Sequence, residues 1–292
     1  MESQDGWENA KVMAHLALDQ RPEFTSARLI VAAALEQDQR YADANAIYAK
    51  IPITSPLSWS ARMHLANNYD RMDNTKRAIR LFEKLARERA DSANPLIALG
   101  DLLRRHERFK EAASAYTRAL ARVTDLRAAH WVLYYSRGIA YEQSKQWPKA
   151  EADFLKALDL SPDQPLTLNY LGYSWIDLGQ HLERSLAMIK KAVELRPRDG
   201  YIVDSLGWGL YRTGDFKGAV KSLERAVMLL PADPVVNDHL GDALWRVGRT
   251  REARFQWERA LKMEPTADLA KAIAAKLEGG LPAAKNAAKS AK

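Results

Sequence analysis

The sequence predicts an all-α protein, a right-handed superhelical α-solenoid of helix-turn-helix repeats. The first observation behind this prediction is a repeat: the landmarks of residues 200–233 recur 34 residues later, so that Leu206-Gly207 reappears as Leu240-Gly241. The second is periodicity, because apolar residues recur every three to four positions and no segment alternates as a strand would. Glycine and proline are also sparse, at 14 and 12 of 292 residues, which favours helices over turns.

Small residues stand where helices must approach one another. Gly207, Ala219 and Ala226 fall at positions where a larger side chain would hold neighbouring helices apart. Pro231 stops the second helix, because proline lacks an N–H donor and clashes with the preceding turn. One repeat cannot bury its apolar stripe alone, so its stability must come from stacked neighbours. This placement of small, large and proline residues resembles the tetratricopeptide repeat, a unit of about 34 residues.

The repeat divides the chain into consecutive segments. We expect a partial repeat, seven full tetratricopeptide repeats, a C-terminal capping helix and a disordered basic tail. Their bounds are 1–24 for the partial repeat, 25–58, 59–92, 93–130, 131–164, 165–199, 200–233 and 234–267 for the full repeats, 268–278 for the capping helix and 279–292 for the tail.

Both ends of the repeat array depart from the full unit. Ala10, Ala17 and Pro22 match only the second helix of a repeat, so we expect residues 1–24 to lack a first helix and the chain to be the C-terminal part of a longer protein. At the other end, Thr266 is expected to cap a helix whose Lys271 and Lys276 leave one face polar, as a terminal cap requires.

The repeat at 93–130 contains an irregular joint. Thr124 stands where proline is expected, and residues 127–130 are additional to the period. Two interpretations are open: the joint changes the superhelical pitch or separates two subdomains, or the second helix is simply one turn longer.

The composition excludes several kinds of chemistry. With no cysteine, the chain has no disulfide, no thiolate zinc site and no cysteine nucleophile. The six histidines form no helical metal pair and no HExxH motif occurs, while Gly207-Trp208-Gly209 lies inside a predicted helix rather than after a strand. The sequence therefore predicts no catalytic residue, no metal site, no cofactor and no enzyme. No apolar run approaches the length of a transmembrane helix.

The first helices of the repeats are expected to line a concave groove that binds a protein or peptide segment. Aromatic and arginine side chains are typical of binding hot spots, since they give large rigid contact area and fix register. The predicted groove residues are Tyr135, Asn169, Tyr173, Tyr201, Asp204, Trp208, Tyr211, Arg212, Asp238, Asp242, Trp245 and Arg246.

An alternative is that the aromatic members pack between neighbouring first helices, as Trp147, Trp175 and Trp257 are expected to do in the core. The net charge of +7 is mostly a solvated helix face on so extended a protein. Nucleic acid is not expected as a partner, because Asp204, Asp238 and Asp242 among the groove aromatics would repel phosphates.

The run from Asn169 to Leu261 carries phrases beyond the general repeat: LGYSWIDLG, DGYIVDSLGWGLYRTGD and DHLGDALWRVGRTREARFQWERAL. These phrases, DSLGW and HLGDALW above all, resemble the C-terminal half of proteobacterial tetratricopeptide lipoproteins typified by the lipoprotein binding partner of a carboxyl-terminal processing protease. The resemblance implies an exported adaptor, anchored at the outer membrane by an N-terminal lipid, that presents envelope substrates to a periplasmic protease. No lipid-attachment cysteine is present in this chain.

The favoured hypothesis is therefore a non-catalytic scaffold or adaptor, periplasmic and associated with the outer membrane in the full-length protein. Two alternatives remain open. The chain is then either the regulatory tetratricopeptide region of a larger enzyme, such as a glycosyltransferase, or a cytoplasmic assembly factor.

Overall fold

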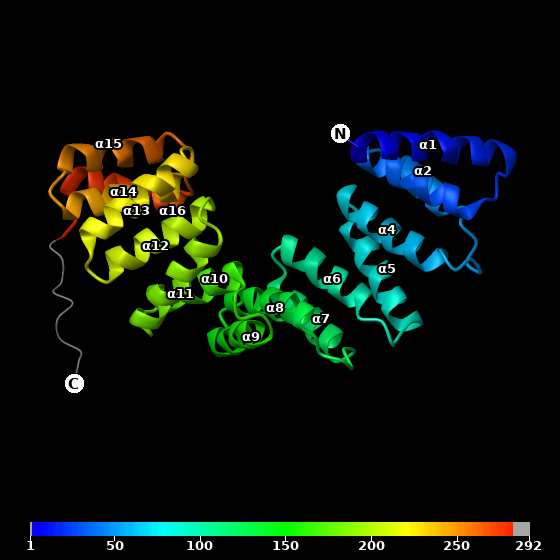
Figure 1. The fold of residues 1–292 in the computed structure, drawn as a ribbon, viewed down its shortest axis with the longest axis horizontal. Coiled ribbons are helices and arrows are strands. Elements are labelled where there is room, and N and C mark those ends of the chain that lie inside the picture. The colour runs from blue at the N-terminus through cyan, green and yellow to red at the C-terminus, as the bar shows by residue number, and fades with distance from the viewer. Residues whose placement is uncertain (1, 283–292) are drawn as a thin grey trace. The chain divides into compact units, whose positions relative to one another are not determined.

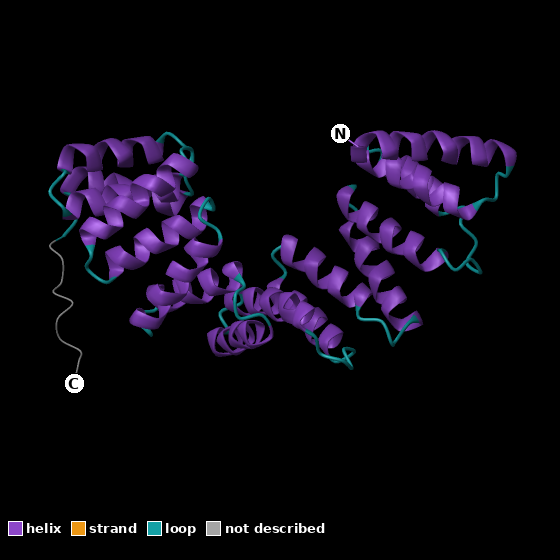
Figure 2. Ribbon diagram, viewed as in Figure 1, coloured by secondary structure: helices purple, strands orange, loops and turns teal. Residues whose placement is uncertain are grey.

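The computed structural model describes residues 2–282, so the predicted tail lies outside the described residues from residue 283 onward. Within this range every regular element is a helix (Figures 1 and 2), as the sequence predicts. The elements are α1 (Glu2–Gln20), α2 (Thr25–Gln37), α3 (Tyr41–Tyr48), α4 (Ser58–Arg71), α5 (Thr75–Glu88), α6 (Asn94–Arg105), α7 (Phe109–Leu120), η1 (Ala128–His130), α8 (Trp131–Gln143), α9 (Trp147–Leu160), α10 (Pro165–Asp177), α11 (Leu182–Leu195), α12 (Gly200–Arg212), α13 (Phe216–Leu229), α14 (Pro234–Arg246), α15 (Thr250–Leu261) and α16 (Ala267–Gly279).

The helices pack as antiparallel hairpins in two compact units. The division between the units falls between Asp153 and Phe154, inside α9. In the first unit α2 packs on α3, α4 on α5 and α6 on α7, and in the second α10 packs on α11, α12 on α13 and α14 on α15. None of the helices in residues 2–282 combines the length and the hydrophobicity that a bilayer-spanning segment requires.

Close approach within a hairpin explains the glycines of the repeat. A Cβ atom on Gly207 would lie 2.4 Å from Cγ of Leu223, and one on Gly241 would lie 2.4 Å from Cδ1 of Trp257. Leu223 and Trp257 are fully buried, so neither can move aside. The steric reason inferred from the spacing is thus confirmed: a glycine on the first helix makes room for a large residue on the second.

Aspartate side chains cap the N-termini of three helices of the second unit. The Asp233 Oδ1 atom accepts hydrogen bonds from the backbone N–H of Val235 and Val236, at 2.9 and 3.0 Å. The side chains of Asp199 and Asp215 cap α12 and α13 in the same way. Such caps satisfy backbone donors that have no partner inside the helix, and they fix where α12, α13 and α14 start.

The irregular joint at the end of the 93–130 repeat is not formed by a second helix that is one turn longer. Helix α7 ends at Leu120, and the short 3-10 helix η1 fills the joint, so the second helix is not one turn longer. The two units also do not divide here, since their boundary lies further along the chain, within α9. Local bonds instead shape the joint: the backbone N–H of Arg127 donates to Nδ1 of His130 at 2.8 Å.

Candidate functional site

The structure places the predicted groove residues on first helices of both units. Tyr135 lies on α8 in the first unit, where its ring contacts Trp131 with centroids 5.7 Å apart. The remaining residues lie in the second unit: Asn169 and Tyr173 on α10; Tyr201, Asp204, Trp208, Tyr211 and Arg212 on α12; Asp238, Asp242, Trp245 and Arg246 on α14. These three helices are neighbours, because α12 contacts both α10 and α14.

An aromatic stack joins α12 to α14. The Trp208 ring stacks on Tyr211, with centroids 5.0 Å apart and planes 10° apart, and on His239, at 4.2 Å and 15°. Trp208 and Tyr211 are half-buried, so they neither lie free on the rim nor disappear into the core. The Trp208 Nε1 atom is buried and has no hydrogen-bond partner among the described residues.

Two further groove residues differ in their surroundings. Tyr173 on α10 is half-buried, and burial, together with the charges of Asp204 and Asp177, raises the pKa of its hydroxyl to about 12. It therefore stays protonated and able to donate a hydrogen bond. Tyr201 is 61% exposed at the start of α12, outside the aromatic stack.

Asp204 is engaged in a buried pair with His239. The His239 Nδ1 atom lies 3.0 Å from Oδ1 and 3.1 Å from Oδ2 of Asp204, and both residues are 7% exposed. Burial opposes a charge on the imidazole, but the attraction of Asp204, Asp238 and Asp242 outweighs it and raises the pKa of His239. Asp204 is thus held by His239 and is unavailable to a partner.

Helix α16 closes the groove over α14. The Lys276 ammonium lies 2.8 Å from both carboxylate oxygens of Asp238 and 2.9 Å from Oδ2 of Asp242. The Trp257 indole N–H donates to Oδ1 of Asp242 at 3.0 Å. Asp238 and Asp242 therefore do not face an open groove, which corrects the sequence-based prediction. Lys276, expected on a solvated face, is instead largely buried as their counter-ion.

Trp245 and Arg246 also contact the chain's own C-terminal part. A Cβ atom on Gly280, which has φ 72°, would lie 2.1 Å from the Trp245 ring. Arg246 donates from Nη1 to the Pro282 carbonyl oxygen at 2.6 Å and from Nε to the Tyr211 hydroxyl at 3.2 Å. These two residues hold the segment after α16. The sequence did not predict this contact, because the spacing of apolar residues within a helix does not show which neighbouring helix the last helix covers.

The arginines that end the first helices α6 and α12 reach back to the preceding repeat. Arg212 donates from Nη1 to Oδ1 of Asp177 on α10 at 3.2 Å, and Arg105 donates from Nη2 to Oδ2 of Asp70 on α4 at 3.0 Å. The spacing is 35 residues in both cases. The structure therefore gives Arg212 a partner within the chain, whereas the sequence placed it among the residues that contact a bound segment.

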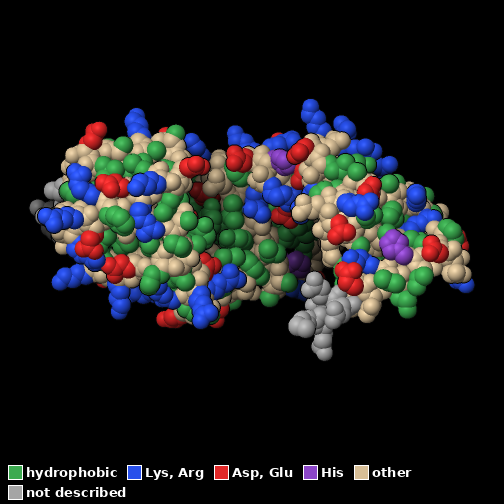
Figure 3. Space-filling view, turned by 90° about the horizontal axis from the view of Figure 1, so that it is seen from above, with side chains coloured by type: hydrophobic (Ala, Val, Ile, Leu, Met, Phe, Trp, Pro, Cys, Tyr) green, Lys and Arg blue, Asp and Glu red, His purple; other side chains and the backbone are tan. Residues whose placement is uncertain are grey.

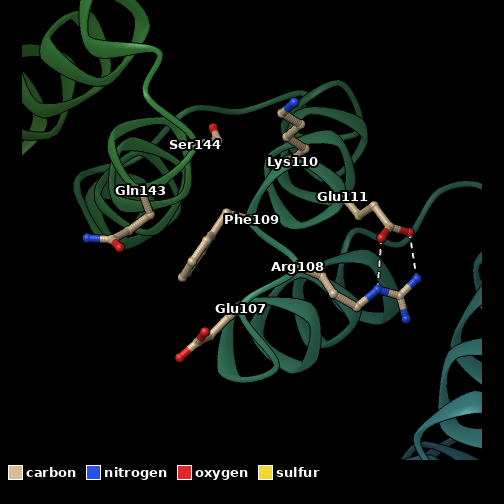
Figure 4. Close-up of a pocket in the computed structure, with 7 residues that line it drawn as sticks. All are labelled: Glu107, Arg108, Phe109, Lys110, Glu111, Gln143 and Ser144. Atoms are coloured by element: carbon tan, nitrogen blue, oxygen red, sulfur yellow. Dashed lines mark hydrogen bonds and ion pairs between the residues drawn. The ribbon is translucent and has the colours of Figure 1, made fainter. Parts of the chain in front are cut away.

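Outside the α10–α14 face, charged side chains are spread over the described surface. On the face shown in Figure 3, Lys and Arg side chains are intermixed with Asp and Glu rather than gathered into one charged field. A cavity of about 310 Å³ lies at the turn between α6 and α7 (Figure 4), where Arg108 and Glu111 form a bidentate ion pair at 2.7 and 2.8 Å beside Phe109. Within residues 2–282 no group of three or more His, Asp or Glu side chains converges as metal ligands would.

The tetratricopeptide repeat family model matches residues 63–120 and 97–165. A curated relative, the TPR repeat-containing protein PA4667 of Pseudomonas aeruginosa, is 33% identical over 91 residues, which is 31% of this chain and 15% of that protein. The chain thus spans a small part of the length of this relative.

Several solved structures share the fold. The anaphase-promoting complex hetero-tetramer Cut9–Hcn1 is 16% identical with a TM-score of 0.66, covering 94% of this chain and 53% of that one. A tetratricopeptide repeat protein from Parabacteroides merdae is 15% identical, with a TM-score of 0.64 and 87% and 97% covered. YrrB, described as having an unusual peptide-binding site, is 22% identical, with a TM-score of 0.51 and 66% and 97% covered. At these identities the likeness to solved structures concerns the fold alone, and the family match adds that residues 63–165 carry tetratricopeptide repeats.

Proposed function

We propose that the protein is a non-catalytic adaptor that holds a segment of a partner protein along α10 and α12. Helix α16 covers α14, so only α10 and α12 of the second unit leave their first-helix faces open to a partner. The groove is therefore shorter than the sequence predicted. Its candidate contact residues are Tyr173, Trp208 and Tyr211, which are half-buried and present rigid amphipathic rings. Side chains of this kind contribute most of the binding energy at protein interfaces.

The single observation that carries the proposal is the unpaired Trp208 indole N–H. A buried donor without a partner costs free energy, which an acceptor brought by a bound segment would recover. The buried Oδ1 atom of Asn169 on α10 also lacks a partner among the described residues. A backbone carbonyl and N–H brought by a partner segment would satisfy both atoms once neighbouring side chains shift to admit it.

The resemblance of Asn169–Leu261 to protease-binding lipoproteins supports a more specific proposal. The partner is then a carboxyl-terminal processing protease, and the full-length protein acts in the periplasm from an outer-membrane lipid anchor. The likeness to YrrB, described as having a peptide-binding site, supports peptide capture as the mode of binding.

The test is binding of a purified carboxyl-terminal processing protease from the source organism, measured by calorimetry. Tyr173→Ala is expected to weaken binding by about thirtyfold, the effect of losing a hot-spot residue. Phe255→Ala is the matched control, because Phe255 is an aromatic residue that is 57% exposed on the second helix α15.

Equal weakening by both variants, or unchanged binding in Tyr173→Ala, would contradict the proposed groove. If the unsubstituted chain does not bind the protease, the protease is the wrong partner. Far-ultraviolet circular dichroism of each variant keeps a folding defect apart from a binding defect.

A further inference from the structure

The first unit contains a second concave site, on the inner faces of α2, α4 and α6. A cavity of about 750 Å³ opens there, lined by Glu36, His64, Asn67, Asp70, Arg71 and Arg105 among others. All of these residues belong to the unit that precedes Phe154, so the site is separate from the α10–α12 groove.

The carboxylates of this cavity already have counter-ions. Oε2 of Glu36 lies 3.1 Å from Nδ1 of His64. Asp70 accepts from Nη2 of Arg105 at 3.0 Å and pairs with Nε2 of His106 at 2.7 Å. Burial raises the pKa of Asp70, but these hydrogen bonds and that of Thr75 outweigh it, so the net effect is a lowered pKa. A basic ligand would therefore have to displace existing ion pairs.

Arg71 is a charged residue of this cavity that has no counter-ion among the described residues. It is exposed and forms no hydrogen bond or ion pair with another described residue, and its guanidinium lies 5.8 Å from the centroid of the Tyr41 ring. Contact with an aromatic face restricts the guanidinium while leaving its N–H groups free to donate. Asn67, one turn earlier on α4, is exposed and adds an amide on the same helix face.

We propose that this cavity is a second binding site, which takes the Asp or Glu side chain of an extended, acidic partner segment. Arg71 holds the carboxylate through its planar pair of N–H donors, and the Asn67 amide donates to the same group or to the adjacent backbone. Charge complementarity favours an acidic segment, because Glu36 and Asp70 are already paired within the chain. The N–H groups of Arg71 remain free to donate to an anion.

The experiment uses the whole chain and two blocked peptides, Ac-Gly-Glu-Asp-Glu-Asp-Gly-NH2 and its amide analogue Ac-Gly-Gln-Asn-Gln-Asn-Gly-NH2. Blocked ends leave only side-chain carboxylates. Calorimetry at low salt is expected to show binding of the acidic peptide and at least tenfold weaker binding of the analogue. Arg71→Gln is expected to weaken the acidic peptide about tenfold, and Arg71→Lys by less, because lysine keeps the charge but loses the fork.

Arg127→Gln is the matched control. Arg127 is exposed, its removal changes the net charge equally, and it lies in the joint before α8, outside the cavity. Equal weakening by Arg127→Gln and Arg71→Gln would overturn the proposal in favour of general attraction to a cationic protein. Equal binding of both blocked peptides would overturn it too, as would binding only of an analogue with a free C-terminus. None of these outcomes depends on the α10–α12 groove.

Discussion

Arg259 donates from Nη2 to the backbone carbonyl oxygen of Pro231 at 3.0 Å, which ties α15 to the residue that ends the preceding repeat. Arg225 makes the same bond with the carbonyl of Pro197 one repeat earlier. Both prolines lie after the end of a second helix, so their carbonyl groups have no partner within that helix, and each accepts from an arginine of the next repeat. The bond thus belongs to the stacking of repeats rather than to either helix alone.

Removing this tie is expected to lower stability modestly. Arg259→Gln should reduce the free energy of unfolding by about 0.5–1 kcal/mol, because one hydrogen bond at a partly exposed site is lost. Urea denaturation followed by circular dichroism measures the change. Arg251→Gln on the same helix is the control, since Arg251 is exposed. Equal effects of the two variants would show that the Pro231 contact contributes nothing.

The Trp245 ring leaves no room for a side chain at position 280, whereas a side chain at position 279 would meet open space. Gly280→Ala places a Cβ against the indole at positive φ and is expected to cost about 1–3 kcal/mol and to loosen α16. Gly279→Ala, with nothing within 4 Å, is expected to be neutral or slightly stabilising. Hydrogen exchange of the α16 amides measures both. Unchanged protection in Gly280→Ala would contradict the contact.

Lys276 is expected to stabilise the second unit strongly. Lys276→Met leaves Asp238 and Asp242 buried without their cation, which should cost about 3 kcal/mol. Denaturant unfolding measures this loss. Lys271→Met, at an exposed position of the same helix, should change stability by less than about 0.5 kcal/mol. A combined Lys276→Met, Asp238→Asn, Asp242→Asn variant should recover part of the loss, and no recovery would mean that the charges are not the cause.

The buried His239 predicts a pH dependence with a definite sign. Its pKa is raised in the folded state, so the folded protein binds more protons than the unfolded chain. The stabilisation is fully present below the ordinary histidine pKa of about 6.5 and is lost as pH rises through the raised value. His239→Gln should remove this part of the pH dependence, which denaturant midpoints measured from pH 5 to 9 would detect. Parallel profiles for the variant and the unsubstituted protein would contradict it.

Some turns place a non-glycine residue in the left-handed backbone region, where substitution by glycine is expected to raise stability. Lys145 follows α8 with φ 62°, where Gly214 and Gly248 stand in later repeats with φ 91° and 84°. Lys145→Gly should raise the free energy of unfolding by about 0.5–1 kcal/mol, because a Cβ is strained in this region. Gln143→Gly, at the last residue of α8, should instead lower it slightly, because glycine has the poorer helix propensity. Thermal unfolding measures both, and a loss in Lys145→Gly would show that its side chain contributes more than the strain.

The sequence predicted the helical repeats because their cause is local and periodic. Gly241 opposite Trp257 is a steric requirement that recurs at a fixed spacing, so one chain is enough to reveal it. Trp175 and Trp257 are buried as expected, whereas Trp147 is only partly buried.

The candidate site was harder to predict because it depends on contacts between repeats. Asp204 with His239 and Asp238 with Lys276 are 35 and 38 residues apart, and no period relates the second pair. The sequence showed that acids and aromatics share a helix face. It could not show that the last helix would cover α14, nor that an uncovered arginine would remain at Arg71.

The back-reaching arginines tie each of these hairpins to the one before it. Arg105 pairs with Asp70 and Arg212 pairs with Asp177. An ion pair serves both of its members, so damage to either hairpin leaves a charge of its neighbour without that partner. Hairpins joined in this way are expected to lose their order together.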